Sequence, residues 1–484
     1  MNAFTRRRLL QWAAATAATG LLASCGGGGA TPTTAPQSGG GAQASPTAAA
    51  TSAAATPTKA ASTAVATPTV ITTSQAKGTG TLKILQWSHF VPDYDKWFDQ
   101  YVQKWAQQNN VTVVSDHINY ADIPARAAAE VSAQSGHDLF AFGFPPAQYE
   151  TEVVPLNDLV SQLKQKYGDP YPLYERSCHN PKTDKWFAFM DFWAVDPILY
   201  RTDLFQQVGG NPDTWEGILE AGRKLKPKGT PIGIGFSPEI DTGMAMRTIM
   251  WGFGASIQDA NGNIVLDSPE TRDALKFAAS LFKDAETEEV LAWDASSNNR
   301  LLASGRGALI LNAISALRTI ESTYPDLAKN VGVAKTPAGP KDRRGSAHWF
   351  NCFVIWKFSP NVDLAKKFLL DLVDNYKEAF TASRFYNVPS FPKAVPDWQE
   401  QVKNDPKATP PDKYTVLGTA PDWTVNIGYP GYMNAAEAEI FDRWIINDMF
   451  TKVATGKASV DDAISTAVQQ VKDIFNKWKQ RGLI

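Results

Sequence analysis

The chain has 484 residues, with 47 Lys and Arg against 49 Asp and Glu and a formal charge of -2. Because this balance leaves no basic surplus, we do not expect nucleic acid as a partner. Apolar residues make up 43% and charged residues 20%, which is enough for a packed core and excludes a wholly disordered chain. The length predicts two or three domains.

The first 24 residues have the composition of a secretory signal. Arg6 to Arg8 precede an apolar run from Leu9 to Leu22, and the paired arginines favour twin-arginine export. The run is shorter than the roughly 20 residues that span a membrane, so a retained transmembrane anchor is the weaker interpretation. Leu22-Ala23-Ser24-Cys25 resembles the lipobox of bacterial lipoproteins. This resemblance implies a signal peptide over 1–24 and a lipidated Cys25, with an ordinary cleavage site as the alternative.

Residues 26–80 consist almost entirely of Gly, Ala, Thr, Pro and Ser, and only Lys59 and Lys77 are charged. Such a segment buries too little apolar surface to offset its ordering entropy. We therefore expect 25–80 to be a flexible tether, with a root-mean-square span of about 40 Å. The expected arrangement is an extracytoplasmic body anchored to the cell membrane by the lipid on Cys25.

From residue 81 onward, strand-like and helix-like stretches alternate, which predicts an α/β fold. Strands are predicted at 82–87, 111–114 and 138–142, and helices at 93–107 and 123–133. This order implies a parallel, doubly wound sheet whose functional loops follow the carboxyl ends of its strands. Those loops begin near Trp87 and at Gly143-Phe144.

Two extended apolar stretches, 186–193 and 197–205, lie close together and could carry the chain from one lobe to another. A helix is predicted over 216–224, with Thr214 as its cap. Asn261-Gly262 is a hairpin turn signal. A further helix is predicted from Pro269 to Lys283.

These pieces resemble the family 1 extracellular solute-binding proteins, the sugar-binding lipoprotein components of ABC importers. The matching stretches are Trp87-Ser88, Leu199–Phe205 with Thr214-Trp215-Glu216, Phe253–Ser256 with Asn261-Gly262, Ala303–Ala308, Val331–Pro337 and Ala365–Leu369. The resemblance implies two doubly wound α/β lobes joined by hinge strands, with the ligand cleft between them. Lobe 1 would comprise 81–194 plus 346–395, and lobe 2 would comprise 195–345 plus 396–484.

The resemblance also implies a monomeric receptor that captures a mono- or oligosaccharide and delivers it to an ABC transporter permease. The same fold hosts many ligands, so an amino-sugar, a polyol, glycerol phosphate or a polyamine is an alternative solute. A phosphate ester would need an Arg or Lys cluster in the cleft, and a polyamine several carboxylates. A secreted hydrolase with Asp191 paired to Glu437 is the alternative from another class.

No serine-hydrolase elbow, Walker A loop, dinucleotide fingerprint or zinc-protease motif occurs in the sequence, and the five histidines are scattered. We therefore predict no catalytic residue, no cofactor and no metal site. Cys178 and Cys352 could form a bridge in an oxidising exterior, but two buried thiols are the favoured interpretation.

Aromatic residues at predicted strand ends or in Gly/Pro-rich loops are the candidate ligand contacts, because the flat faces of sugars stack on aromatic rings. These candidates are Trp87, Phe144, Trp193, Trp251, Trp349, Tyr429 and Tyr432, with core packing as the alternative for each. The polar candidates are Asp191, Asn312 and Asn351. Asp191 is notable because burying an unpaired carboxylate is costly, whereas the family resemblance places the segments of Asn312 and Asn351 in the cleft. Trp97, Trp105, Trp215, Trp444 and Trp478 follow helical patterns instead, which favours packing.

Overall fold

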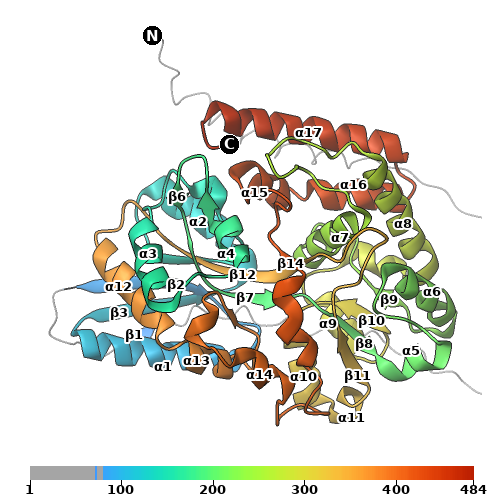
Figure 1. Ribbon diagram of the computed structural model, residues 1–484, viewed down its shortest axis with the longest axis horizontal. Helices are drawn as coiled ribbons and strands as arrows, with labels where there is room; N and C mark the ends of the chain where they lie inside the picture. Colours follow the sequence, from blue (N-terminus) through green and yellow to red (C-terminus); the bar gives the residue numbers. More distant parts are fainter. Residues whose placement is uncertain (1–70, 73–79) are drawn as a thin grey trace, which may run out of the picture. The chain divides into compact units, whose positions relative to one another are not determined.

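The computed structural model describes residues 71–72 and 80–484, and its strands form two main sheets (Figure 1). The expected signal peptide, Cys25 and nearly all of the tether lie outside the described residues. Within the part of the chain that is described, no helix is long and apolar enough to cross a membrane.

The larger sheet combines distant parts of the chain. In spatial order its strands are β1 (Ile71–Thr72), β3 (Thr112–Ile118), β2 (Thr81–Trp87), β4 (Leu139–Phe142), β12 (Gly345–Ile355), β7 (Phe189–Val195) and β13 (Val388–Pro389), with β14 (Thr424–Val425) beside β12. Strand β2 is parallel to β3 and β4, as the predicted order requires, whereas β12 is antiparallel to β4 and β7. Strands β7 and β12 are buried along their whole length, which is typical of strands covered on both faces.

The helices near this sheet begin and end where local chemistry places their boundaries. They are α1 (Pro92–Asn109), α2 (Ile123–Ala133), α3 (Asn157–Tyr167), α4 (Pro172–Cys178), α12 (Val362–Val373), α13 (Tyr376–Ala382) and α14 (Trp398–Lys403). Helix α1 starts with a proline and two acidic residues in its first turn, and it ends at Asn110 in the left-handed conformation. The predicted helices at 93–107 and 123–133 are thus confirmed.

The smaller sheet has four strands, and its flanking helices were partly predictable. Its spatial order is β11 (Val331–Ala334), β8 (Ile198–Arg201), β10 (Leu309–Leu311) and β9 (Ile232–Gly233). The later helices are α5 (Thr202–Val208), α6 (Trp215–Leu225), α7 (Ile240–Phe253), α8 (Pro269–Ala285), α9 (Ser297–Ala303), α10 (Ser315–Thr323), α11 (Pro325–Ala328), α15 (Ala435–Asp442), α16 (Ile445–Ala454) and α17 (Val460–Gln480). Thr214 caps α6 as predicted, since its Oγ1 accepts a hydrogen bond from the Gly217 N–H at 3.1 Å. Gly262 takes a φ of 77° in the predicted hairpin, where Gln258 pairs with Ile264.

Short elements connect these units. The remaining two-stranded sheet is β5 (His179–Asn180) with β6 (Lys185–Trp186). The 3-10 segments are η1 (Tyr120–Asp122), η2 (Ala147–Tyr149), η3 (Lys226–Lys228), η4 (Glu288–Ala292), η5 (Pro392–Ala394) and η6 (Thr415–Asp422). Two of them, η1 and η2, follow the carboxyl ends of β3 and β4, where the doubly wound order places functional loops.

The body is two-lobed, with one main sheet in each lobe, and its buried apolar residues form two clusters. The first cluster contains the core of the larger sheet and also Leu199, Ile310 and Val331 of the smaller sheet, whereas the second contains Ile198, Leu309 and Leu311. The chain passes from one sheet to the other between β7 and β8 and returns between β11 and β12. Buried residues of the segment 398–433 belong to the cluster of the larger sheet, whereas α16 and α17 pack into the other cluster. The boundaries 81–194 plus 346–395 and 195–345 plus 396–484 stay a prediction.

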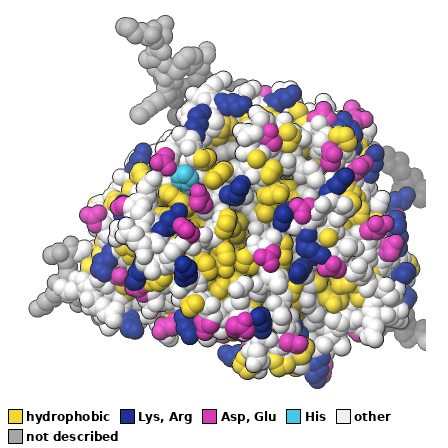
Figure 2. All heavy atoms as spheres, viewed as in Figure 1, with side chains coloured by type: hydrophobic (Ala, Val, Ile, Leu, Met, Phe, Trp, Pro, Cys, Tyr) yellow, Lys and Arg dark blue, Asp and Glu magenta, His cyan; other side chains and the backbone are white. Residues whose placement is uncertain are grey.

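The surface is electrostatically mixed on the face drawn in Figure 2. Lys and Arg side chains are interspersed there with Asp and Glu, and apolar side chains lie between them. The chain as a whole has nearly equal numbers of acidic and basic residues.

Candidate ligand cleft

A cavity of about 400 Å³ opens between loops from distant parts of the chain. One wall comes from η1, the loop after β4 and Trp349 of β12, and the other comes from residues 238–240, 293–295 and 438–444. Its volume lies within the range of small-molecule sites. The doubly wound order had placed a functional loop at Gly143-Phe144, and both residues line this cavity.

Trp349 is the centre of the first wall. Its ring centroid lies 5.4 Å from that of Phe144 and 5.5 Å from that of Tyr120. A Cβ atom on Gly143 would lie 2.2 Å from the Trp349 ring, so the close approach of this backbone requires glycine. Phe144 also lies 4.8 Å from Phe441 of α15. Aromatic rings from segments far apart in the chain therefore meet at the cavity.

Two further predicted residues support Trp349 from behind. The Trp87 ring lies 4.4 Å from the Trp349 ring, and the Trp87 Nε1–H donates to Asn351 Oδ1 at 2.7 Å. Both Trp87 and Asn351 are buried and neither lines the cavity. They therefore hold the aromatic wall in place.

Asp191 lies in the core of the larger lobe, away from the cavity lining. The Tyr94 hydroxyl and the Asn351 amide donate to Asp191 Oδ2, each at 3.4 Å. Desolvation raises the pKa of Asp191 to about 7, although these donors and Tyr376 oppose the shift. Two effects therefore lower the free-energy cost of burying this carboxyl group. Its raised pKa favours protonation, and the neighbouring side chains donate hydrogen bonds to it.

The other predicted contacts are spread over different parts of the body. Trp193 packs against Tyr171 near Pro421 and Thr424, Trp251 packs against Tyr429, Tyr432 lies under Arg176, and Asn312 donates to Asn298. None of Trp193, Trp251, Tyr429, Tyr432 and Asn312 lines the cavity. Loops rich in aromatic residues pack on one another here, so a loop position alone does not distinguish a cleft residue.

Several lining residues were not predicted. They are Tyr120, Trp293, Phe441, Trp444, Glu239, Asp294 and Asp442. Trp444 packs against the apolar cluster of the larger sheet, as expected, but it takes a φ of 56° at the break between α15 and α16 and also lines the cavity. The apolar pattern continues through both helices, so it carries no signal of this break.

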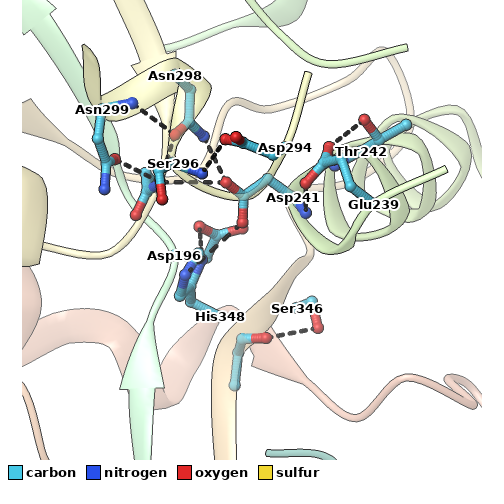
Figure 3. A network of polar contacts seen from close by, with 12 residues as sticks. Asp196, Glu239, Asp241, Thr242, Asp294, Ser296, Asn298, Asn299, Ser346 and His348 are labelled. Atoms are coloured by element: carbon cyan, nitrogen blue, oxygen red, sulfur yellow. Dashed lines mark hydrogen bonds and ion pairs between the residues drawn. The ribbon is translucent and has the colours of Figure 1, made fainter. Parts of the chain in front are cut away.

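Figure 3 shows a buried polar network next to the cavity. The ring of His348 lies 3.1 Å from Asp196 Oδ1 and 3.8 Å from Asp241 Oδ1, and the Asn298 amide donates to Asp241 Oδ2 at 2.6 Å. Burial raises the pKa of Asp196 and Asp241. Desolvation opposes protonation of His348, but Asp196, Asp241 and Glu239 together raise its pKa. The network thus connects β12, the segment between β7 and β8, and the first turn of α7.

Three carboxylates line the cavity, and each has a different set of partners. Glu239 caps α7 by accepting from the N–H groups of Asp241 and Thr242. Asp294 accepts from the Ser296 N–H at 2.9 Å and from Arg300 at 3.0 Å. Asp442 accepts a hydrogen bond from the Gln148 amide at 2.9 Å, across the cleft. The cleft thus combines aromatic faces with carboxylate acceptors, a combination that suits hydroxyl or ammonium groups.

Among residues 71–72 and 80–484, no group of three or more His, Cys, Asp or Glu side chains could hold a metal ion. Cys178 and Cys352 are buried and unbridged, with their Sγ atoms 3.6 Å apart. The interpretation of two buried thiols is confirmed.

Comparisons with known proteins agree with this architecture. The profile of the bacterial extracellular solute-binding protein family matches residues 91–369. A binding protein of Brucella abortus (strain 2308) is 24% identical over 286 residues, which cover 58% of this chain and 66% of the relative. A Deinococcus radiodurans protein named as an ABC transporter-binding protein is 28% identical over 160 residues, covering 31% of this chain and 38% of the relative. The matches thus span less than two thirds of these relatives.

Solved structures share the fold at low identity. A sugar transporter from Arthrobacter chlorophenolicus A6, with bound laminaribiose, has a TM-score of 0.68 at 18% identity and covers 81% of this chain and 99% of its own. A solute-binding protein from Thermotoga lettingae TMO, bound to alpha-D-tagatose, has a TM-score of 0.68 at 19% identity. The match covers 82% of this chain and 100% of that structure's chain. At these identities the similarity concerns the fold.

Proposed function

Because the chain belongs to the bacterial extracellular solute-binding protein family, we propose that it binds a carbohydrate between its lobes and delivers it to an ABC transporter permease. The observation that supports this most directly is the cavity itself, where Trp349 and Phe144 lie together with Phe441 and three carboxylates from distant segments. Stacking faces and hydroxyl acceptors are the groups that a saccharide needs.

Closure of the lobes would be driven by the solute. A solute that touches both walls gains its full set of contacts only in the closed state, so it favours that state. The crossings between β7 and β8 and between β11 and β12 would serve as the hinge, in line with the expected lobe boundaries. The permease would then recognise the closed arrangement.

The sequence of the N-terminus supports a tethered receptor, and the family resemblance supports a monomer. The signal over 1–24, the lipidated Cys25 and the linker over 25–80 would place the body outside the cytoplasm and near the membrane. Mass spectrometry of the mature protein tests this part, because a lipid on Cys25 adds a defined mass that a Cys25→Ala variant lacks.

Two alternatives have less support. The hydrolase alternative needs carboxyl groups on opposite sides of one bond, but neither Asp191 nor Glu437 lines the cavity. Glycerol phosphate needs basic partners, and no Lys, Arg or His occurs among the described residues that line the cavity. Neutral and amine-bearing solutes remain compatible with the lining.

Tryptophan fluorescence of the full chain tests the carbohydrate assignment, because Trp293, Trp349 and Trp444 line the cavity. We expect a saturable change with one class of mono- or oligosaccharide and no turnover of that sugar. Phe144→Ala should weaken binding, whereas Phe277→Ala, which removes a half-buried ring outside the cavity, should not. Silence toward every sugar, or release of reducing sugar, would contradict the proposal.

A further inference from the structure

We infer that the solute carries a positive charge, supplied by an amino group, which contacts Asp442 while the rest of the solute stacks on the aromatic wall. This inference rests on the proposed function and adds the charge class of the ligand. The described cavity lining contains Glu239, Asp294 and Asp442 and no lysine, arginine or histidine. A ligand in this space therefore meets acidic side chains and no basic one. Desolvation raises the pKa of Glu239, and desolvation with the nearby Glu439 raises the pKa of Asp442 to about 7, so an ammonium group beside Asp442 would favour its charged form.

Of these three carboxylates, Asp442 lacks a charged partner in its hydrogen bonding. Glu239 is engaged by the start of α7, and Asp294 forms an ion pair with Arg300 at 3.0 Å. Asp442 instead accepts from a neutral amide, that of Gln148. It is also the last residue of α15, where the partial negative charge of the helix terminus adds to its own.

The nearest arginines do not compensate for this charge. Arg443 follows Asp442 in the chain, but its guanidinium pairs with Glu439 at 3.5 Å. Arg247 lies behind Phe441, with its guanidinium 4.9 Å from the ring centroid, and the buried Glu437 acts on it with opposite charge. Neither arginine lines the cavity.

Tyr120, on the opposite wall, lies near a separate group of carboxylates that does not include Asp442. Its pKa is raised above the ordinary value by desolvation first, and then by the charges of Asp241, Glu239 and Asp294. The field that resists ionisation of this phenol would also resist a phosphate or a uronate in the cavity.

An ammonium group fits this surrounding in two ways. It would pair with the Asp442 carboxylate, and it could lie against the faces of Phe441 or Trp444, whose ring centroids are 5.6 Å apart. The hydroxyl groups of a sugar would use the remaining acceptors. The solute class that satisfies all of these groups is an amino sugar.

Calorimetry on the purified full chain tests the inference with near-isosteric probes. These are glucosamine, glucose and glucuronic acid, their β-1,4-linked dimers, and spermidine. We expect the amine-bearing sugar to bind at least tenfold more tightly than its neutral counterpart, and the acidic sugar to bind most weakly. Equal binding of the neutral form, or tighter binding of the acidic form, would overturn the charge inference and leave the carbohydrate receptor standing. Binding of spermidine alone would support a positively charged solute and overturn the carbohydrate assignment. Binding of none of the probes would overturn both the charge inference and the carbohydrate assignment.

Asp442→Asn locates the charge recognition, because it removes the charge and keeps an oxygen acceptor. Asp473→Asn is the matched control: Asp473 accepts from the Gln469 amide at 2.9 Å on α17 and does not line the cavity. We expect Asp442→Asn to reduce the affinity for the amino sugar at least tenfold and that for the neutral sugar less than twofold. Equal losses for both sugars, or equal effects of the two variants, would overturn the assignment to Asp442.

Discussion

Two neighbouring residues of β12 serve two different acidic regions. Trp349 lines the cavity, whereas His348 lies in the buried network with Asp196 and Asp241. In the network the carboxylates have a histidine partner supplied by the chain, whereas Asp442 in the cavity has only a neutral amide. The comparison indicates that acidic side chains are structural where the fold provides their countercharge, and available to a ligand where it does not.

Trp349→Ala should have the largest effect, because this fully buried indole supports the aromatic wall. We expect a loss of about 3–5 kcal/mol in the free energy of unfolding, together with loss of solute binding. Urea denaturation and fluorescence titration measure the two effects. A stability loss below about 1 kcal/mol would mean that the wall does not depend on this residue.

His348→Ala should have the next largest effect, because it removes the basic partner of two buried carboxylates. Breaking such a pair leaves uncompensated charge, and we expect a loss of about 3 kcal/mol in the free energy of unfolding. His179→Ala is a useful control, since the partner of His179, Asp184, is exposed. Equal losses in the two variants would show that the network is not held by its countercharge.

The free energy of unfolding should depend on pH through the buried network around His348. The pKa of His348 is raised in the folded protein, so the native state binds more protons there than the unfolded state. Its contribution is complete below the unfolded pKa of 6.5 and is lost as the pH rises through the folded value. The raised pKa values of Asp196 and Asp241 act in the same direction over a window that begins near 3.8.

The stability difference between the wild type and His348→Ala should therefore shrink above pH 6.5, by less than the total effect of the substitution. Urea titrations from pH 6 to pH 9 measure this difference. A difference that grows with pH would contradict the assigned direction.

Gln148→Ala should have the smallest effect, because it removes one amide donor to Asp442 across the cleft and leaves that carboxylate in place. We expect a change of about 1 kcal/mol or less in the free energy of solute binding. Gln469→Ala removes the corresponding amide from Asp473 on α17 and should leave binding unchanged. Calorimetry compares the two variants, and a large loss in Gln148→Ala would make this amide a principal ligand contact.

Much of the fold could be predicted because its signals are local. The proline and acidic first turn of α1, the Thr214 cap of α6 and the Asn261-Gly262 turn act within a few residues of their own positions. The alternation of strands and helices likewise predicted the parallel pairing of β2 with β3 and β4.

The residues that line the cleft were predicted only in part, because the set of lining residues depends on which loops meet in space. Phe144 and Trp349 follow the strand-end rule and line the cavity, but Trp87 and Trp193 satisfy the same rule and are core residues. Trp444 carries a helical pattern and still reaches the cavity, because a backbone break redirects it.

The electrostatic features of the molecule were likewise predictable only where they depend on composition and not on contacts between distant segments. Composition alone established a nearly neutral chain, and the aromatic content pointed to a stacking ligand. The placement of Asp442 in the cavity and of Asp196 beside His348 depends on contacts between segments far apart in the chain. Electrostatic partners are set by distance in space, so sequence predicted which side chains exist and folding determined which of them are left without a countercharge.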